Sequence, residues 1–196
     1  MTSRVLFIIA LALSTAAFAG TKTAKAAKSK NPHAVVKTNM GTFECDLYES
    51  DAPKTVKNFV GLAKKKFFNG LRFHRVIKGF VIQGGDPLTR DKSKMDHWGT
   101  GGESIYGKEF EDELNPNTPS YKKGYVAGVL AMANHGPNTN TSQFFVMCGS
   151  TLPHQYTIFG AVTKGLDVVM KIDNVETVKP ADRPKNDVII ESITVK

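Results

Sequence analysis

The stretch Phe73-His74-Arg75-Val76-Ile77-Lys78-Gly79-Phe80-Val81-Ile82-Gln83-Gly84-Gly85-Asp86 indicates the fold most strongly. It reads as two short strands around Gly79, because apolar runs on either side of a glycine are typical of paired strands. Side chains alternate along a strand, so Phe73, Arg75 and Ile77 are expected to share one face. An arginine between apolar neighbours is costly to bury without a partner. From the residues alone, Arg75 lies either at the rim of the sheet, with its guanidinium in water, or in a functional site.

Short apolar segments on both sides of this stretch predict a mainly β fold. In residues 42–48, Phe43, Cys45 and Leu47 alternate with polar neighbours, as in a half-buried strand. Similar segments predict strands over 34–39, 126–133, 143–147, 157–162 and 187–196, and the Gly-, Pro- and charge-rich residues 84–124 read as long surface loops. Many short strands in one domain favour an antiparallel sheet that closes or nearly closes, since closure removes exposed edges.

Two segments predict helices that cover the ends of such a barrel. Ser50 or Asp51 can cap the first helix, Pro53 suits its first turn, and Gly70 ends it. Its apolar face consists of Val56, Phe59, Val60, Ala63 and Phe67. The second helix spans 165–173, with an apolar face of Leu166, Val169, Met170 and Ile172.

The N-terminus has the pattern of a secretory signal peptide. Arg4 precedes an apolar run from Val5 to Ala16, and Ala17-Phe18-Ala19 supplies a small-residue cleavage site before Gly20. The run is shorter than the roughly 20 residues that a membrane span needs. We therefore expect residues 1–19 to be removed on export, most simply to the bacterial periplasm, with no stable membrane insertion afterwards. Residues 20–32 read as a flexible lysine-rich tail and 33–196 as one folded domain.

The net charge of +8 does not by itself indicate nucleic-acid binding. The lysines of the tail and Arg4 carry much of the excess, and from Asn31 onward 21 basic residues face 18 acidic ones. The folded part is therefore close to neutral. No nucleic-acid partner is expected, and the tail reads as a solvated spacer that could touch an anionic surface weakly.

Several other chemistries lack their usual motifs. The five histidines have no paired metal-ligand spacing and no CxxC is present, so no metal site is expected from these residues. The loop Gly99-Thr100-Gly101-Gly102 lacks the strand–helix context of a phosphate loop. No GxSxG elbow is present, and the acidic residues 109–113 read as a solvated face. Cys45 and Cys148 are either separate buried thiols or a disulfide.

Three motifs, in order along the chain, resemble those of the cyclophilin family of peptidyl-prolyl isomerases: residues 73–86, the segment 99–113 and the segment Gly128–Phe145, which contains Ala133-Asn134-His135-Gly136-Pro137-Asn138. The resemblance covers about residues 34–196, and an exported member is similar to the bacterial periplasmic cyclophilins. It implies a closed eight-stranded antiparallel β-barrel capped by two α-helices. It also implies catalytic roles for Arg75 and Gln83, substrate-binding roles for nine further residues, and no metal or cofactor. Those nine residues are Phe80, Val81, Gly99, Ala133, Asn134, His135, Gln143, Phe145 and Tyr156.

The same resemblance implies the reaction, which is cis–trans isomerisation of X–Pro bonds in unfolded or nascent exported proteins by a monomer. The alternative is a non-catalytic proline-peptide binding module or holdase. Two departures concern the pocket: the family often has a tryptophan before the position of Tyr156, where this chain has a shortened loop with His154, and Val81 replaces a commoner methionine. The only tryptophan, Trp98, lies in a lengthened loop from Pro87, and these departures predict weak cyclosporin binding.

Overall fold

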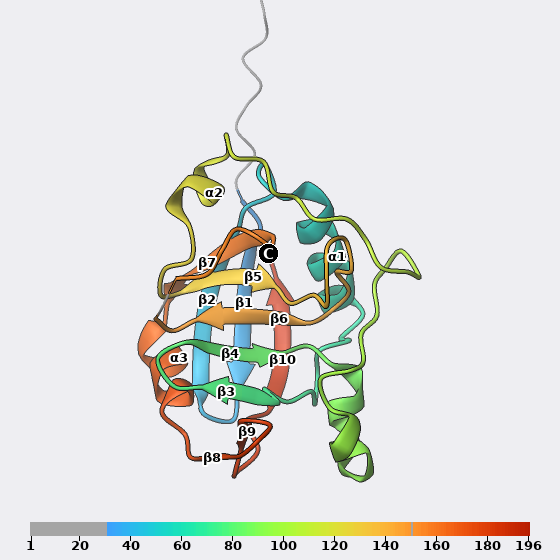
Figure 1. The fold of residues 1–196 in the computed structure, drawn as a ribbon, viewed down its shortest axis with the longest axis vertical. Coiled ribbons are helices and arrows are strands. Elements are labelled where there is room, and N and C mark those ends of the chain that lie inside the picture. Colours follow the sequence, from blue (N-terminus) through green and yellow to red (C-terminus); the bar gives the residue numbers. More distant parts are fainter. Residues whose placement is uncertain (1–30, 150) are drawn as a thin grey trace, which may run out of the picture.

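A computed structural model describes residues 31–149 and 151–196. The expected signal peptide and most of the tail lie outside the described residues. The dominant element is an eight-stranded antiparallel sheet in the order β10-β1-β2-β7-β5-β6-β4-β3 (Figure 1). Its strands are β1 (His33–Thr38), β2 (Gly41–Leu47), β3 (Arg75–Ile77), β4 (Val81–Gly84), β5 (Val129–Met132), β6 (Phe144–Met147), β7 (Ile158–Lys164) and β10 (Ile190–Val195).

The sheet curls but is not a fully closed barrel, so the predicted closure was too strong. The edge strands β3 and β10 form no continuous ladder with each other. Instead, the irregular segment before β3 makes a few backbone bonds, including Phe73 N–H to Val188 O at 2.9 Å and Ile190 N–H to Leu71 O at 2.8 Å. One isolated bridge joins Arg72 to Ile189. A three-residue β3 is too short to pair along the whole of β10.

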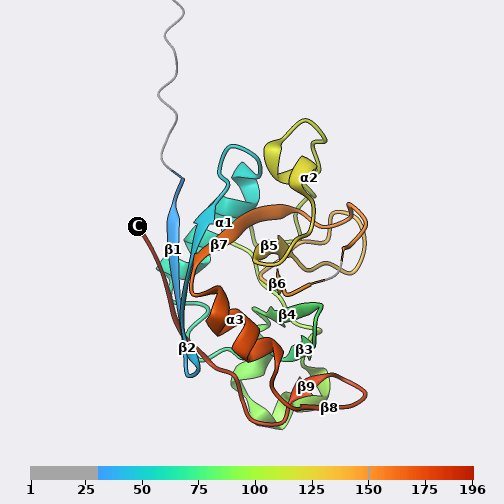
Figure 2. The ribbon, with the colours of Figure 1, turned by 90° about the vertical axis from the view of Figure 1, so that its left-hand side faces the viewer.

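Two helices pack against the sheet as predicted, α1 (Pro53–Lys64) and α3 (Leu166–Asp173) (Figure 2). The predicted cap of α1 was wrong. Asp51 accepts a bond from Ser120 N–H instead, and the Glu113 carboxylate accepts from Lys54 N–H at 3.0 Å and Thr55 N–H at 2.8 Å. Helix α1 also ends before Gly70, because Lys66 takes a left-handed conformation with φ 56°.

The region 84–124 contains short elements that its composition did not predict. They are the 3₁₀ turns η1 (Pro87–Arg90) and η2 (Lys92–His97) and the helix α2 (Pro119–Lys123). Side-chain oxygens start the two turns: Asp86 accepts from Leu88 N–H at 2.8 Å and Asp91 from Ser93 N–H at 2.9 Å. A two-stranded hairpin of β8 (Thr177–Val178) and β9 (Arg183–Pro184) was also not predicted. It lies beside β3 (Figure 1).

The central strands carry apolar side chains on both faces. Ile82, Leu130, Phe144 and Val146 point into the main core, where Phe59 of α1 packs edge-on against Phe144 at 5.5 Å between ring centroids. The alternate residues form a second, smaller cluster on the other face, made of Val81, Tyr125, Val129, Ala131, Phe145, Met147 and Ile158. A half-exposed face would normally be polar at these positions. The second cluster therefore marks where the sheet supports a site.

Two further expectations concern thiols and membranes. Cys45 and Cys148 are both buried and both free, so the structure contains no disulfide between them. Burial raises the pKa of each thiol above its ordinary value. Among the described residues, no helix is both long and apolar enough to cross a bilayer.

Candidate active site

A row of four residues crosses the outer face of the sheet above the second cluster. Strand pairing places Arg75 opposite Gln83, Gln83 opposite Phe145, and Phe145 opposite Ala131. Because paired residues on neighbouring strands project to the same side, a charged, an amide and an aromatic side chain are brought together here. Phe73 does not share this face. It lies outside β3 and is buried in the main core, and its backbone N–H bonds to Val188 O.

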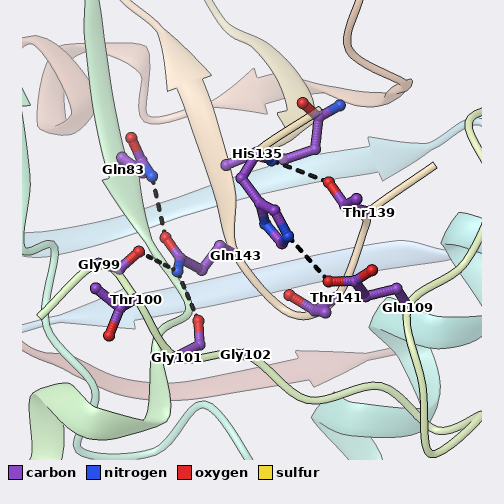
Figure 3. Close-up of a pocket in the computed structure, with 12 residues that line it drawn as sticks. Gln83, Gly99, Thr100, Gly101, Gly102, Glu109, His135, Thr139, Thr141 and Gln143 are labelled. Carbon is purple, nitrogen blue, oxygen red and sulfur yellow. Dashed lines mark hydrogen bonds and ion pairs between the residues drawn. The ribbon is translucent and has the colours of Figure 1, made fainter. Parts of the chain in front are cut away.

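A chain of hydrogen bonds runs from Arg75 across the site. The Arg75 guanidinium donates to Gln83 Oε1 at 3.2 Å, and Gln83 Nε2 donates to Gln143 Oε1 at 3.0 Å. Gln143 Nε2 in turn donates to the carbonyl oxygens of Gly99 at 2.9 Å and Gly101 at 2.6 Å (Figure 3). Each amide is oriented by a partner on both sides. Arg75 is therefore held by a network that fixes where its remaining donors point.

The glycine loop 99–102 is held from its other side by Asp86. This carboxylate is fully buried and accepts from Leu88 N–H, Gly99 N–H and, at 3.3 Å, Gly101 N–H. A side chain on Gly101 would have its Cβ 2.3 Å from Asp86 Oδ1, so the close approach requires glycine. The loop thus binds its own carboxylate rather than a phosphate. From the sequence alone, Asp86 was assigned no role. An aspartate commonly accepts a bond from the amide two residues later in a turn, and this pattern could have identified it.

The apolar part of the site is a cavity of about 570 Å³ beside Arg75. The predicted pocket residues Phe80, Val81, Phe145 and Tyr156 line it together with Leu152. The rings of Phe145 and Tyr156 meet edge-on at 5.5 Å. The volume of this cavity lies within the range of small-molecule sites. Trp98, which the sequence seemed to separate from the pocket, lines the same cavity.

A second cavity, of about 420 Å³, adjoins the first across the predicted groove residues (Figure 3). Gln83, Gly99, Ala133 and Asn134 line both cavities, whereas His135 and Gln143 line only the second. His135 Nε2 lies 3.0 Å from Glu109 Oε1, and its backbone N–H donates to Thr139 Oγ1 at 3.0 Å. All eleven residues predicted to act or bind, from Arg75 to Tyr156, therefore lie along one continuous groove.

The loop that carries Tyr156 is held by a buried tyrosine. The Tyr125 hydroxyl donates to Tyr156 O at 2.6 Å and accepts from Tyr156 N–H at 3.0 Å. His154, suggested as a further groove residue, lines neither of these two cavities. Its ring stacks on Tyr121 at 3.9 Å between centroids, and His154 Nε2 lies 2.8 Å from Tyr121 O. The loop that carries His154 and Tyr156 is thus anchored on Tyr121, within α2, and on Tyr125, just after it.

His74, which directly precedes Arg75 in the sequence, is a buried histidine. His74 is 6% exposed, lines the apolar cavity and has its Nδ1 atom without a hydrogen-bond partner among the described residues. Burial lowers the pKa of His74 to about 4, and Arg75 adds to this effect while Asp86 opposes it. The ring is therefore neutral at pH 7. Its position next to Arg75 in the sequence is the only signal that could have identified it.

Two acidic residues near the site, Asp112 and Glu113, bond to distant parts of the chain. Asp112 accepts from Asn138 N–H at 2.8 Å and from Asn140 Nδ2 at 2.7 Å, and Glu113 caps α1. The predicted solvated acidic face was therefore wrong for these two residues, because loops from distant parts of the chain pack on them. Across residues 31–149 and 151–196, no group of three or more His, Cys, Asp or Glu side chains could hold a metal ion.

Comparison with known proteins places this arrangement in a family. The family model described as "Cyclophilin type peptidyl-prolyl cis-trans isomerase/CLD" matches residues 33–195. The chain is 48% identical over 161 residues to the human peptidyl-prolyl cis-trans isomerase-like 1, covering 81% of this chain and 89% of that protein. It is 40% identical to an Arabidopsis thaliana peptidyl-prolyl cis-trans isomerase, CYP18-2, over 81% of this chain and 90% of that protein.

Solved structures agree with the sequence relatives. A cyclophilin-type isomerase of Cryptosporidium parvum superposes with a TM-score of 0.73 at 36% identity, covering 85% of this chain and 98% of that one. A structure of the same Cryptosporidium protein determined in the presence of the dipeptide Ala-Pro gives a TM-score of 0.72. With the family model, the relatives and the fold in agreement, this chain belongs to the cyclophilin-type peptidyl-prolyl cis–trans isomerases.

Proposed function

We propose that this chain accelerates X–Pro isomerisation in exported proteins, with Arg75 as the group that stabilises the twisted peptide bond. The observation that carries the proposal is the placement of Arg75 beside the apolar cavity lined by Phe80 and Phe145. That cavity can hold a proline ring while the bound Arg75–Gln83 pair faces the same space. The groove residues Ala133 and Asn134 lie next to both and supply backbone contacts for a peptide.

The reaction needs no nucleophile and no metal, because no bond to a heavy atom breaks. The barrier of about 18–20 kcal/mol comes from the partial double-bond character of the C–N bond. As the bond twists, the prolyl nitrogen loses conjugation and becomes a better hydrogen-bond acceptor. A guanidinium donor at that nitrogen binds the twisted state more strongly than the planar state, and only such a difference speeds the reaction. Arginine suits the role because it remains charged and offers several donors.

Gln83 has a separate role in this proposal. Its Oε1 accepts from Arg75 while its Nε2 is held by Gln143, so the amide is a positioning residue for the guanidinium. A preoriented charge acts in a partly dry groove without reorganising during the reaction. We expect Arg75→Ala to lower kcat/KM by about 100-fold or more, since one electrostatic donor is commonly worth that much.

The experiment is an isomerisation assay on proline peptides with the wild type, Arg75→Ala and Arg75→Lys. Arg90→Ala is the matched control, because Arg90 is exposed and bonds to the Phe67 and Asn69 carbonyls away from the groove. The control should keep the wild-type rate. Equal rates for Arg75→Ala and the wild type would refute the assigned mechanism. Binding of proline peptides by a wild type that does not accelerate isomerisation would support the binding-module or holdase alternative.

The export part of the proposal rests on residues 1–19, and the relatives reported above are eukaryotic. Its test is separate from the assay. Cell fractionation and N-terminal sequencing of the full chain should find a mature protein beginning at Gly20 in the exported fraction, monomeric by light scattering. An intact N-terminus in the cytosolic fraction would reject export and leave the isomerase assignment in place.

A further inference from the structure

The cavity beside Arg75 extends past the proline pocket between two segments that lie far apart in the sequence. Met95 and Trp98 come from η2 and its C-terminal cap, and residues 180–183 come from the β8–β9 hairpin. Both segments lie at the end of the molecule where β3 lies (Figure 2). The whole cavity measures about 570 Å³, which is more space than one proline ring fills. The extension is therefore available to a neighbouring residue of a bound peptide.

Trp98 forms a prepared wall of this extension. Its indole N–H donates to Asp91 O at 3.1 Å, so the polar edge of the ring is satisfied within the chain. The ring lies over the Arg72 guanidinium at 5.4 Å, and Arg72 Nε lies 3.0 Å from Asp187 Oδ2. These contacts fix the ring although it is only half-buried. An aromatic ring fixed in advance binds an apolar side chain at a low entropic cost.

The opposite wall is also tied to the catalytic strand. Val76 N–H of β3 donates to Asp182 O at 2.8 Å, so the hairpin tip is bonded to the strand that carries Arg75. Lys179 pairs with the Asp182 carboxylate and neutralises it. Within the residues that the structure describes, no acidic group pairs with Arg183 or with Arg75. The extension thus combines an apolar wall of Met95 and Trp98 with the guanidinium groups of Arg75 and Arg183, which disfavour a basic occupant.

We infer that Trp98 and Met95, facing the tip of the β8–β9 hairpin, form a subsite for an aromatic side chain next to the proline of the substrate. The subsite rests on the proposed function, since it shares its cavity with the proline pocket and with Arg75. An aromatic residue beside proline fills the extension and stacks on Trp98. An alanine leaves the extension to water, and a lysine meets Arg75 and Arg183.

The test measures kcat/KM for proline peptides that differ only in the residue beside proline, with phenylalanine, alanine or lysine placed before the proline in one series and after it in another. In one of the two series we expect the wild type to prefer phenylalanine to alanine about tenfold. Lysine should be the poorest substrate in that series. The ratio between two peptides cancels any general loss of rate in a variant.

Three variants assign the preference to the subsite. Trp98→Ala should reduce the phenylalanine-to-alanine ratio to near one, and Trp98→Phe should restore most of it. Lys94→Ala is the matched control, because Lys94 is exposed on η2 next to Met95 and does not line the cavity. It should keep both the rate and the ratio. A ratio that Trp98→Ala leaves unchanged would overturn the inference.

Fluorescence provides a readout that does not depend on turnover. Trp98 is the only tryptophan of the chain, so intrinsic tryptophan emission reports this subsite alone. Titration with the phenylalanine peptide should shift the emission of both the wild type and Arg75→Ala, and the alanine peptide should shift it less. Normal isomerisation with no aromatic preference in either series would overturn the subsite but not the proposed function. An emission shift without isomerisation would overturn the proposed function but support the subsite.

Discussion

The buried His74 should make the stability of this protein depend on pH in a range where surface histidines have little effect. Its pKa is about 4 in the folded state, compared with 6.5 for an unperturbed histidine. Above pH 6.5 the ring is neutral in both states and contributes no pH dependence. As the pH falls below 6.5, the unfolded state binds a proton that the folded state does not, so unfolding becomes easier. Below about pH 4 both states are protonated and the effect stops growing.

The size of the effect follows from the two pKa values. At 1.36 kcal/mol for each pH unit, the interval from 6.5 to about 4 corresponds to a loss of about 3 kcal/mol in the free energy of unfolding. This is a large share of the stability of an ordinary domain. His74 is 6% exposed, so solvent screening does not reduce the figure greatly.

The perturbation is His74→Gln, which removes the titrating ring, and the assay is urea denaturation at intervals from pH 4 to pH 8. Carboxylates also titrate in this range, so the informative quantity is the difference in unfolding free energy between wild type and variant. We expect that difference to be constant above about pH 7 and to move by about 3 kcal/mol against the wild type by pH 4. A His74→Gln difference that stays flat from pH 7 to pH 4 would refute the reasoning.

Three further predictions use matched pairs of variants. Glu113→Gln should lower the free energy of unfolding by about 1–2 kcal/mol, because the carboxylate caps α1. Glu111→Gln is the control and should leave the free energy of unfolding nearly unchanged, because its pair with Lys54 is exposed. Urea denaturation of both variants at pH 7 decides. Tyr125→Phe should lower the free energy of unfolding by about 1–3 kcal/mol and raise KM, because the loop carrying Tyr156 loses both bonds to the hydroxyl. Tyr121→Phe is the control, because it keeps the ring that stacks on His154. Unchanged stability and kinetics for Tyr125→Phe would contradict this prediction. Gly85→Ala should destabilise the protein by more than about 3 kcal/mol, because φ is 93° and the new Cβ would lie 2.3 Å from Ser142 O. Gly107→Ala should cost about 1 kcal/mol, because φ is 70° there but the space around the new Cβ is open. Thermal unfolding that ranks Gly107→Ala as the less stable variant would reject this account.

Local sequence patterns predicted the elements that make up the fold. The alternation in residues 42–48 became β2, and the apolar runs around Gly79 became β3 and β4. Their pairing brought Arg75 opposite Gln83, as a hairpin requires. Strand periodicity and glycine positions are properties of neighbouring residues, so they can be identified in the sequence.

Errors in the prediction occurred where long-range contacts replaced local ones. Asp51 was an available cap for α1, but Glu113 from a distant loop took that role because packing brought its carboxylate to the helix end. Phe73 was expected beside Arg75 and instead entered the core, since its backbone bonds to Val188 rather than to a strand partner. A local pattern contains no information on which of two competing partners the folded chain brings closer.

The surroundings of Arg75 also depend partly on local sequence and partly on long-range contacts. The sequence placed an arginine and a glutamine in one stretch with large apolar residues, on two predicted strands around Gly79. Tertiary structure decided which segments complete the groove around them: Asp86 and Gln143 hold the glycine loop, Tyr125 holds Tyr156, and Trp98 approaches the hairpin tip at residues 180–183. These partners are separated by 13 residues for Asp86 and Gly99, 31 for Tyr125 and Tyr156, and 42 for Gln143 and Gly101. Only the packing of the curled sheet and its loops brings them within contact distance.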